Sequence, residues 1–504
     1  MRDPFAGNRI PINRIDPVAR KVLDFDPWQQ PNRAGAFNST GATGNYLADE
    51  FAQVYQNDMN LRMDHQFNTK FKIYYSWTDN KFLPGLQRPW NIRPDRPEFD
   101  GSSGNRNPGR NQNMSMGKTY IISPSMVNDA RVGYYRRVSE TVVPSFKQDW
   151  ASKLGIPNVN GDLMPAFGSG DRNTPNTIYG LSGATPNRSV NETVSFRDDL
   201  SLIKGTHAFK MGYDLLRFRL NTATLGNPVA FDFSGSTTGL QPAGNAAPNT
   251  GSPFAGFLTG YVTSATFRSE LSSWLPRSSI HSFYFQDDWK ISPTLTANIG
   301  VRYSNEDPFN TKYGLMSQFD PNATDALTGR KGGITHPTSG LNKRDNNNFN
   351  PRLGLAWHPL QKWVFRGGFG FYTVDVKFPA GRDQYDEYVG TALQQAAPGD
   401  PTPIYQISKG VKPASPVIVN GISPFLGTNY SGRNVSLWDP NLRNPYVMNW
   451  NLSVQHEFTR NYLIEASYQA SGSVGLIERW ELNTFGSDFM ASATPAQRDR
   501  KSVV

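Results

Sequence analysis

The stretch SFYFQDDWKISPTLTANIGVRY, from Ser282 to Tyr303, decides the fold class because its side chains alternate with a period of two. After the break at Ser292-Pro293-Thr294, one parity is apolar: Leu295, Ala297, Ile299, Val301 and Tyr303. Before the break, the matching parity holds Phe283, Phe285 and Trp289. A period of two places each set on one face of a sheet, whereas a helix needs apolar residues about 3.6 positions apart. The stretch predicts a β-hairpin with one aromatic, apolar face and one polar face.

The same pattern recurs along the chain. It predicts six hairpins, within residues 59–77, 117–137, 188–220, 282–303, 349–371 and 450–468, and a further strand near 255–270. The turns inside hairpins take about two to five residues, whereas the segments between hairpins take roughly 30 to 70 and are rich in Asn, Gly, Pro, Asp and Ser. Loops of that length are unusual in a compact soluble domain. Short turns at one end and long loops at the other are typical of bacterial outer-membrane barrels.

The fold class is therefore expected to be all-β, an antiparallel transmembrane β-barrel. A soluble β-sandwich or propeller is the alternative, since alternation also separates a core face from a solvent face. Three features favour the membrane barrel: strands of about ten residues, large aromatic residues near strand ends, and a second face that combines Gly with Arg, Asn or Gln. We expect Trp357, Trp363, Phe365, Trp450 and Tyr462 to face lipid, and Arg352, Arg366 and Glu457 to face the lumen.

The amino-acid composition excludes several further classes of protein. The 504 residues contain no cysteine, which excludes disulfide scaffolds, thiolate metal sites and cysteine nucleophiles. Aromatic residues make up 12% of the chain, so disorder throughout is excluded. No stretch approaches the 18 or so apolar residues of a transmembrane helix. The first residues, MRDPFAGNRIPINRIDPVARKVL, are too polar for a signal peptide, so either the chain is cytoplasmic or its natural start lies upstream.

No catalytic, cofactor-binding or metal-binding residue is expected. The six histidines, His65, His207, His281, His336, His358 and His456, have no metal-ligand spacing. Asp287 and Asp288 are adjacent in a strand and so point to opposite faces, which makes them a poor acid–base pair. The glycine-rich GGFGFY at 367–372 lies in a strand and lacks the following helix of a phosphate loop. Substrate-binding residues stay unassigned.

The formal net charge is +9, but the basic residues are scattered rather than clustered on one element. This distribution does not favour nucleic-acid binding. On the outer side of a barrel, arginines of the loops could contact the phosphates of lipopolysaccharide, which with outer-membrane lipid is an expected partner. One short helix is predicted near the start, with Asp16 as N-cap, Pro17 in the first position, and Val18 to Leu23 following.

Five segments in order resemble TonB-dependent outer-membrane receptors. They are DPFAGNRIPINRIDPVARKVLDFDP (3–27), IKGTHAFKMGYDL (203–215), FYFQDDWKISPTLTANIGVRY (283–303), NFNPRLGLAWHP with KWVFRGGFGFY (348–372), and NPYVMNWNLSVQHEF with NYLIEASYQASGSVGL (444–476). The first is similar to a loop of the Oar-like subgroup. The resemblance implies a barrel of about 22 strands filled by an N-terminal plug, in the outer membrane. It also implies uptake of a ligand driven through the periplasmic protein TonB, with no chemical reaction and no cofactor.

The chain departs from that family pattern at both ends. It shows no signal peptide, TonB box or plug, and the last strands are missing. We expect residues 1–498 to form a partial barrel of about thirteen strands, open because the chain is truncated at both ends. Residues 499–504, DRKSVV, are expected to be a non-native tail, because a common sequencing adapter encodes the same residues. Irregular structure is expected from about residue 486 onward.

Energy-coupled uptake of an unidentified large substrate is thus the leading functional hypothesis. A passive or structural outer-membrane barrel, such as a porin or an adhesin, is the second. A secreted β-rich glycan-binding protein or glycosidase is the third. A plug and TonB box upstream of Met1 would favour the first hypothesis, and solubility without detergent would favour the third.

Overall fold

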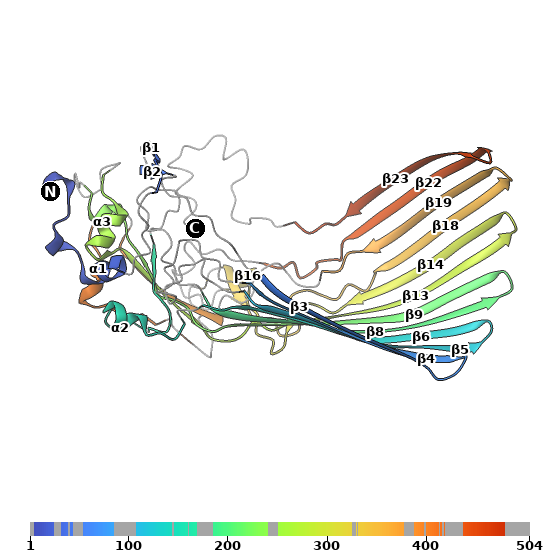
Figure 1. Cartoon of the computed structure of the whole chain (residues 1–504), viewed down its shortest axis with the longest axis horizontal. Helices are drawn as coiled ribbons and strands as arrows, with labels where there is room; N and C mark the ends of the chain where they lie inside the picture. Colours follow the sequence, from blue (N-terminus) through green and yellow to red (C-terminus); the bar gives the residue numbers. More distant parts are fainter. Residues whose placement is uncertain are drawn as a thin grey trace.

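The computed structural model describes residues 5–24, 32–38, 41–43, 54–84, 107–143, 146–159, 161–168, 185–239, 250–324, 329, 331–376, 388–397, 400–412, 414–415, 418 and 437–478. These residues form one long, curved antiparallel sheet, with connecting segments gathered at one of its ends (Figure 1). The predicted tail at 499–504 and the region from 486 onward lie outside the described residues.

The main sheet contains twelve long strands that follow one another as six hairpins (Figure 1). The strands are β3 (Val54–Gln66), β4 (Phe71–Pro84), β5 (Gly109–Ser123), β6 (Met126–Thr141), β8 (Asn187–Lys204), β9 (His207–Thr224), β13 (Pro276–Ser292), β14 (Leu295–Glu306), β18 (Phe349–Leu360), β19 (Trp363–Thr373), β22 (Tyr446–Thr459) and β23 (Tyr462–Val474). Each pairs antiparallel with its neighbours in this order, and the two-residue strand β15 (Asn310–Thr311) pairs beside β13. All six predicted hairpins are confirmed.

Tight turns join the two strands of each hairpin. The third hairpin turns at Gly205, whose φ of +60° is a backbone conformation that glycine adopts without a steric penalty. In the fifth hairpin β18 continues to Leu360, and a register shift precedes the turn at 361–362. The bulge allows the aromatic face of β18 to stay in phase with that of β19.

The expected strand near 255–270 is not part of the main sheet. Its first half is a helix, α3 (Pro253–Leu258), which Ser252 caps by accepting a hydrogen bond from the backbone N–H of Ala255. A capping serine followed by proline is a helix-start signal. The second half is β12 (Ser264–Glu270), which belongs to a small separate sheet. Among the described residues the main sheet has thirteen strands, as expected, but the thirteenth is the short β15 and not a strand near 255–270.

The main sheet does not close. Within the described ranges its two edges are β3, which pairs only with β4, and β23, which pairs only with β22. Both edge strands are exposed along almost their whole length. The fold is thus an open, partial antiparallel barrel, as expected.

The ladder confirms the predicted faces. Trp357 lies opposite Phe365, with ring centroids 5.6 Å apart, and Trp363 stacks on His456 at 4.0 Å. Trp450, Tyr462 and the other large apolar residues of this parity are exposed on the outer face. Arg352, Arg366 and Glu457 fall on the opposite parity, which encloses cavities and is therefore the concave side.

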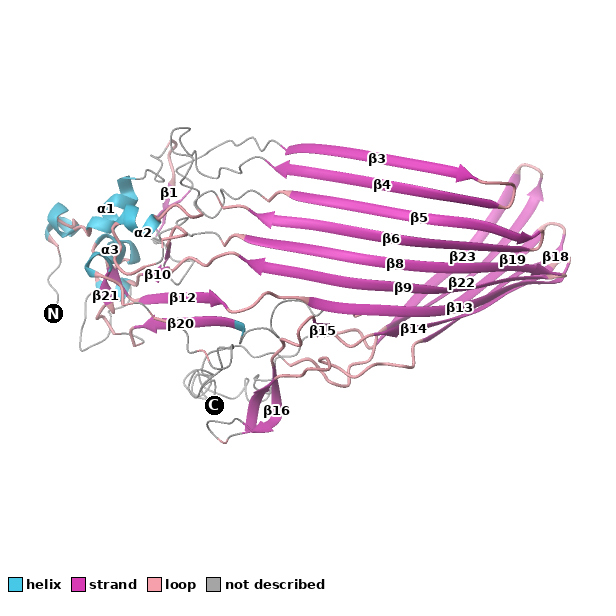
Figure 2. Cartoon of the chain, turned by 90° about the horizontal axis from the view of Figure 1, so that it is seen from below, coloured by secondary structure: helices cyan, strands magenta, loops and turns pink. Residues whose placement is uncertain are grey.

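The segments between hairpins gather at the end of the sheet remote from the tight turns (Figure 2). Their described parts contain helices and short strands in addition to the predicted helix near the start. Besides α3, β12 and β15, these elements are η1 (Ala6–Asn8), η2 (Ile12–Arg14), α1 (Pro17–Asp24), β1 (Ala36–Asn38), β2 (Gly41–Thr43), α2 (Trp150–Leu154), β7 (Ala166–Gly168), β10 (Ala230–Asp232), η3 (Gly235–Thr237), β11 (Tyr261–Val262), β16 (Gln318–Thr324), β17 (Lys331–Thr335), β20 (Val389–Gln395), β21 (Tyr405–Gln406) and η5 (Ile407–Lys409). None of the described helices has the length and apolar character that a membrane crossing requires.

Part of this region is a loop unit with its own apolar core. Val22, Trp150, Phe231, Phe257 and Ile407 are fully buried together, although they come from five distant segments. Four strands, in the order β20-β12-β10-β7, form a small sheet beside this core. The long connections therefore fold together instead of forming separate surface loops.

The predicted helix near the start is confirmed and belongs to this core. Asp16 is buried, and its carboxylate accepts hydrogen bonds from the N–H of Val18 at 2.8 Å and from the hydroxyl of Ser408 at 2.5 Å. The first bond caps α1, and the second ties the helix to a segment almost 400 positions away. One aspartate thus fixes both the start of the helix and its place in the loop unit.

Candidate functional site

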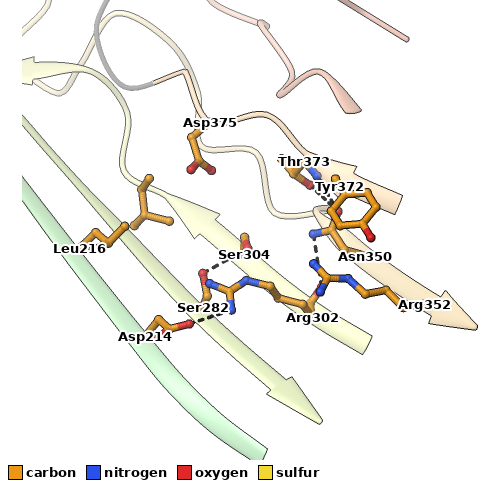
Figure 3. Close-up of a pocket in the computed structure, with 11 residues that line it drawn as sticks. Asp214, Leu216, Ser282, Arg302, Ser304, Asn350, Arg352, Tyr372, Thr373 and Asp375 are labelled. Atoms are coloured by element: carbon orange, nitrogen blue, oxygen red, sulfur yellow. Dashed lines mark hydrogen bonds and ion pairs between the residues drawn. The ribbon is translucent and has the colours of Figure 1, made fainter. Parts of the chain in front are cut away.

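The concave face of the main sheet carries the candidate site. A cavity of about 120 Å³ lies near the loop end, and side chains of β9, β13, β14, β18 and β19 line it (Figure 3). Each of these strands contributes alternate residues, because the polar parity of the sequence points inward. The lining therefore consists mainly of carboxylate, guanidinium, hydroxyl and amide groups.

An ionic network spans four neighbouring strands below this cavity. Arg197 on β8 donates to Asp199 at 2.8 Å and lies 3.6 Å from Asp214 on β9. Asp214 also pairs with Arg302 on β14 at 2.7 Å. The hydroxyl of Tyr284 on β13 donates to Asp199. Asp199 and Asp214 are thus neutralised by two arginines and hydrogen-bonded by a tyrosine. The most enclosed charges of the concave face therefore have partners of opposite charge.

A layer of neutral polar groups borders the network. The hydroxyls of Ser282 and Ser304 lie 3.1 Å apart across the β13–β14 pair. Asn350 is 2% exposed, and its side-chain oxygen accepts from the backbone N–H of Thr373 at 2.7 Å and from its hydroxyl at 2.9 Å. These bonds satisfy groups that burial would otherwise penalise, and they hold the upper ends of β14, β18 and β19 together.

Arg352 is the cation best placed to meet a ligand on this face. It lines the first cavity and a second one of about 250 Å³, whose lining includes Asn298, Asn449 and Asn451. Its guanidinium lies over the ring of Tyr372, 4.6 Å from the centroid. Among the described residues it forms no ion pair with a carboxylate. The site can therefore offer hydrogen-bond donors and one uncompensated positive charge to a polar partner.

The described residues contain no group of three or more His, Asp or Glu side chains that could hold a metal ion. The histidines instead serve local contacts. His207 Nδ1 lies 2.6 Å from an oxygen of Asp287, and His281 Nδ1 lies 2.8 Å from the Tyr213 hydroxyl. His65 packs edge-on against Phe67, and His456 stacks on Trp363.

The two adjacent aspartates point to opposite faces, as predicted. Asp287 meets His207 on the outer face, whereas Asp288 accepts from Gln286 at 3.0 Å and from Asn298 at 2.5 Å on the concave face. The GGFGFY segment lies inside β19, also as predicted. Neither feature brings an acid and a base together around a reacting position.

Sequence reasoning placed Arg352 on the concave face but did not find the ionic network. The partners in this network can be predicted from the sequence once the turn between β8 and β9 is located. With the turn at Gly205 and Thr206, residues equally far from it face each other, which pairs Arg197 with Asp214 and Asp199 with Gly212. The next strand adds Tyr284 and Ser282 opposite Gly212 and Asp214. The following strand adds Arg302 opposite Tyr284. The network therefore follows from exact register across four strands, which alternation alone leaves open.

The chain is similar to one known protein family and to several solved structures. A family model described as an outer membrane beta barrel domain matches residues 1–502. The comparison with curated proteins gave no match. The outer membrane transporter YddB from Escherichia coli is 11% identical, with a TM-score of 0.47, and the match covers 83% of this chain and 40% of that one.

Two further solved structures are similar at the same level. The siderophore receptor PirA from Acinetobacter baumannii is 11% identical, with a TM-score of 0.39, over 84% of this chain and 43% of that one. The FrpB iron transporter from Neisseria meningitidis is 10% identical, with a TM-score of 0.38, over 88% and 49%. The chain spans less than half the length of each of these proteins. With almost its whole length matched by the family model, the chain belongs to the outer membrane beta barrel domain family and lies in the outer membrane.

Proposed function

We propose that the chain forms part of the barrel of a TonB-dependent receptor of the Oar-like subgroup, which imports a large substrate across the outer membrane. In this proposal the barrel catalyses no reaction and needs no cofactor. Energy reaches it from TonB through a plug that lies outside residues 1–504. Residues 1–498 are the barrel portion and residues 499–504 a non-native tail.

The observation that carries the proposal is the ordered set of five sequence motifs. Four of them lie on hairpins of the main sheet: 203–215 on β8–β9, 283–303 on β13–β14, 348–372 on β18–β19 and 444–476 on β22–β23. The fifth, at 3–27, includes α1 of the loop unit. Motifs that resemble hairpins of these receptors are therefore hairpins here, in the same order.

The concave face supports the same reading. A receptor lumen must bind a folded plug or a polar substrate without a dry apolar core. The layer around Arg302, Asn350 and Arg352 offers charged and amide groups to such a partner. A partner that brings a carboxylate to Arg352 would complete the charge balance of this face.

A passive or structural barrel remains the second candidate, since an open lumen would also be polar. The secreted glycan-binding alternative is set aside, because the chain belongs to an outer-membrane family. Conductance separates the first two. The protein encoded by the complete reading frame should show no steady ion current in a planar lipid bilayer, because a plug fills the lumen. A stable ohmic channel would indicate a porin and contradict the proposal.

A closed protein could still be an adhesin. The second measurement is therefore binding of the purified periplasmic domain of TonB to the same protein in detergent. We expect a saturable complex that is lost when the segment ahead of the plug is deleted. A closed protein that does not bind TonB would favour the structural role.

A further inference from the structure

A row of charged residues crosses the outer face at the loop end of the sheet. Residues directly opposite one another in the ladder run Asp79, Gln112, Arg136, Glu192, Arg219 and Arg277, on β4, β5, β6, β8, β9 and β13. These strands lie side by side in this order (Figure 2). Arg277 and Arg219 share the parity of Phe283, Phe285 and Phe209, and hence the outer face. We call these six residues the rim row.

The rim row lies at the depth where hydrocarbon gives way to lipid headgroups. Trp289 marks the turn end of β13, and Arg277 is twelve residues further along the same strand. At about 3.3 Å per residue this is about 40 Å along the strand. For a strand tilted by about 40°, the height is about 30 Å, just above an apolar band about 25 Å tall. Arg217, ten residues from His207 on β9, lies near the upper edge of that band by the same reasoning.

The charges of the rim row and of its neighbours on the outer face are balanced on β4, β5, β6 and β8 but not on β9 and β13. On β4 and β5, Asp79 pairs with Arg110 at 2.7 Å. On β6 and β8, Glu192 lies 3.8 Å from Arg136 and accepts from the Tyr134 hydroxyl at 2.5 Å.

On β9 and β13, by contrast, three arginines come together. Arg219 lies directly opposite Arg277, and Arg217 is two positions away on the same face. Among the described residues, none of the three forms an ion pair with a carboxylate. Glu192 lies directly opposite Arg219 on β8 but is shared with Arg136 and Tyr134, so three arginines face one shared acid. Like charges opposite each other destabilise a sheet, so the excess positive charge has a cost in the protein alone.

Arg277 is nevertheless held in a fixed orientation. Its guanidinium donates to the backbone oxygens of Leu220 at 2.9 Å and Pro276 at 2.7 Å, and to the side-chain oxygen of Asn221 at 2.7 Å. Arg217 is exposed and Arg219 is half-buried. One arginine is thus pre-positioned by neutral acceptors, with two more cations beside it that keep their donors free.

An aromatic border lies below the arginine cluster, and it continues onto β13 and β9 because Tyr303 lies opposite Phe283 and Phe283 lies opposite Tyr213. At the loop ends of β14 and β18, Tyr303 packs on Phe349 with centroids 4.7 Å apart, and Phe371 packs near Tyr446 at 5.7 Å. An aromatic border is the usual boundary of a membrane barrel. The arginine cluster therefore lies on the loop side of the aromatic border, where β9 and β13 extend beyond it.

We propose that Arg217, Arg219 and Arg277 form a binding site for the phosphate groups of a phosphorylated lipid of the outer leaflet. A phosphate placed between opposed arginines turns their repulsion into charge-assisted hydrogen bonds, and the guanidinium fork matches phosphate geometry. The neighbouring apolar face at the same strands receives the acyl chains. The inference depends on the membrane location of the chain and not on the transport proposal.

Lipid titration by native mass spectrometry of protein purified from outer membranes tests the site. The probes are bisphosphorylated lipid A, the same lipid with both phosphates removed, and inorganic phosphate. In the double variant Arg217→Gln, Arg219→Gln, we expect the affinity for bisphosphorylated lipid A to fall about tenfold or more, because charge-assisted bonds are lost. Affinity for the dephosphorylated lipid should not change.

Arg137→Gln is the matched control, because Arg137 is exposed, lies next to Arg136 and belongs to the concave face. It should leave lipid A binding unchanged. Arg217→Gln alone provides a second variant, because Arg217 is exposed and its side chain forms no hydrogen bond with another described residue. Equal loss in Arg137→Gln, or no loss in either arginine variant, would overturn the proposal. Equal competition by millimolar inorganic phosphate would show a free-phosphate site and overturn it as well.

Discussion

Asp214 on β9 accepts a hydrogen bond from Arg302 on β14 at 2.7 Å, although strand β13 lies between them. The intervening position is Ser282, whose side chain is too short to separate the two groups. A small residue between an acid and a base thus allows a charge pair to bridge three strands. Because Asp214 also lies near Arg197, the contact links β8 to β14 through one carboxylate.

This bridge should make a measurable contribution to stability. A double-mutant cycle with Asp214→Asn and Arg302→Gln should give a coupling free energy of about 1 kcal/mol, discounted because Arg302 is 30% exposed. The single change Asp214→Asn should cost more than the coupling, because it also leaves Arg197 with one acid fewer. Reversible urea unfolding in lipid gives these values.

The Arg62–Asp64 pair supplies the control for that cycle. Its side chains are 60% and 59% exposed, so its coupling should be close to zero. Equal coupling for the two pairs would mean that the network around Asp214 is as accessible to water as the exposed concave side of the edge strand β3.

Adjacent residues of β22 should tolerate a new charge very differently. Val454 lies on the outer face between Phe365 and Ala466, about halfway up the apolar band, whereas Gln455 lies on the concave face opposite Glu465. Val454→Arg should cost about 2–4 kcal/mol of folding free energy in a bilayer. Gln455→Arg should cost less than about 1 kcal/mol, because it gains an acidic neighbour. Similar costs at both sites would show that the faces are misassigned.

The core of the loop unit contains a buried polar group that a substitution can remove. The hydroxyl of Tyr405 is buried without a hydrogen-bond partner among the described residues, and burial raises the pKa of this phenol. Tyr405→Phe should therefore stabilise the loop unit by up to about 1 kcal/mol at neutral pH. Protection of residues 400–412 from protease measures the change. Faster cleavage of the phenylalanine variant would mean that the hydroxyl has a stabilising partner.

The same tyrosine predicts a sign for the alkaline pH dependence. In the unfolded chain it titrates near pH 10, and in the folded chain its raised pKa keeps the proton to higher pH. The folded state then binds more protons than the unfolded state above about pH 10, so stability falls as pH rises through that region. The difference between wild type and Tyr405→Phe should widen above pH 10, measured with an alkali-tolerant protease. A constant difference across that range would refute the burial of the phenol.

Alternation made the main sheet predictable. The six hairpins, their order and the outward positions of Trp357 and Trp450 follow from side-chain parity, because a strand between lipid and water must keep its period over its whole length. The helix that begins at Pro17 could also be predicted, because its signals, an N-cap aspartate followed by proline, lie next to each other in the sequence.

The loop unit could not be predicted in this way. Val22, Trp150 and Ile407 meet only after the barrel strands bring their segments to one end, so no local window contains the core. The prediction of a strand at 255–270 was wrong in its first half. Ser252 and Pro253 start a helix there, and this helix signal is stronger than the weak alternation of apolar residues. The ionic network required the register of four strands at once, and one residue of error would have moved every partner to the other face.

The central claim is that one parity of each strand faces lipid and the other faces a polar lumen. Because the chain has no cysteine, single cysteines at positions 449 to 456 of β22 can each carry a unique spin label in outer-membrane vesicles. Accessibility to oxygen should peak at the even positions and accessibility to a water-soluble nickel complex at the odd ones, with a period of two and opposite phase. Two profiles without alternation, or with the phases exchanged, would contradict the account.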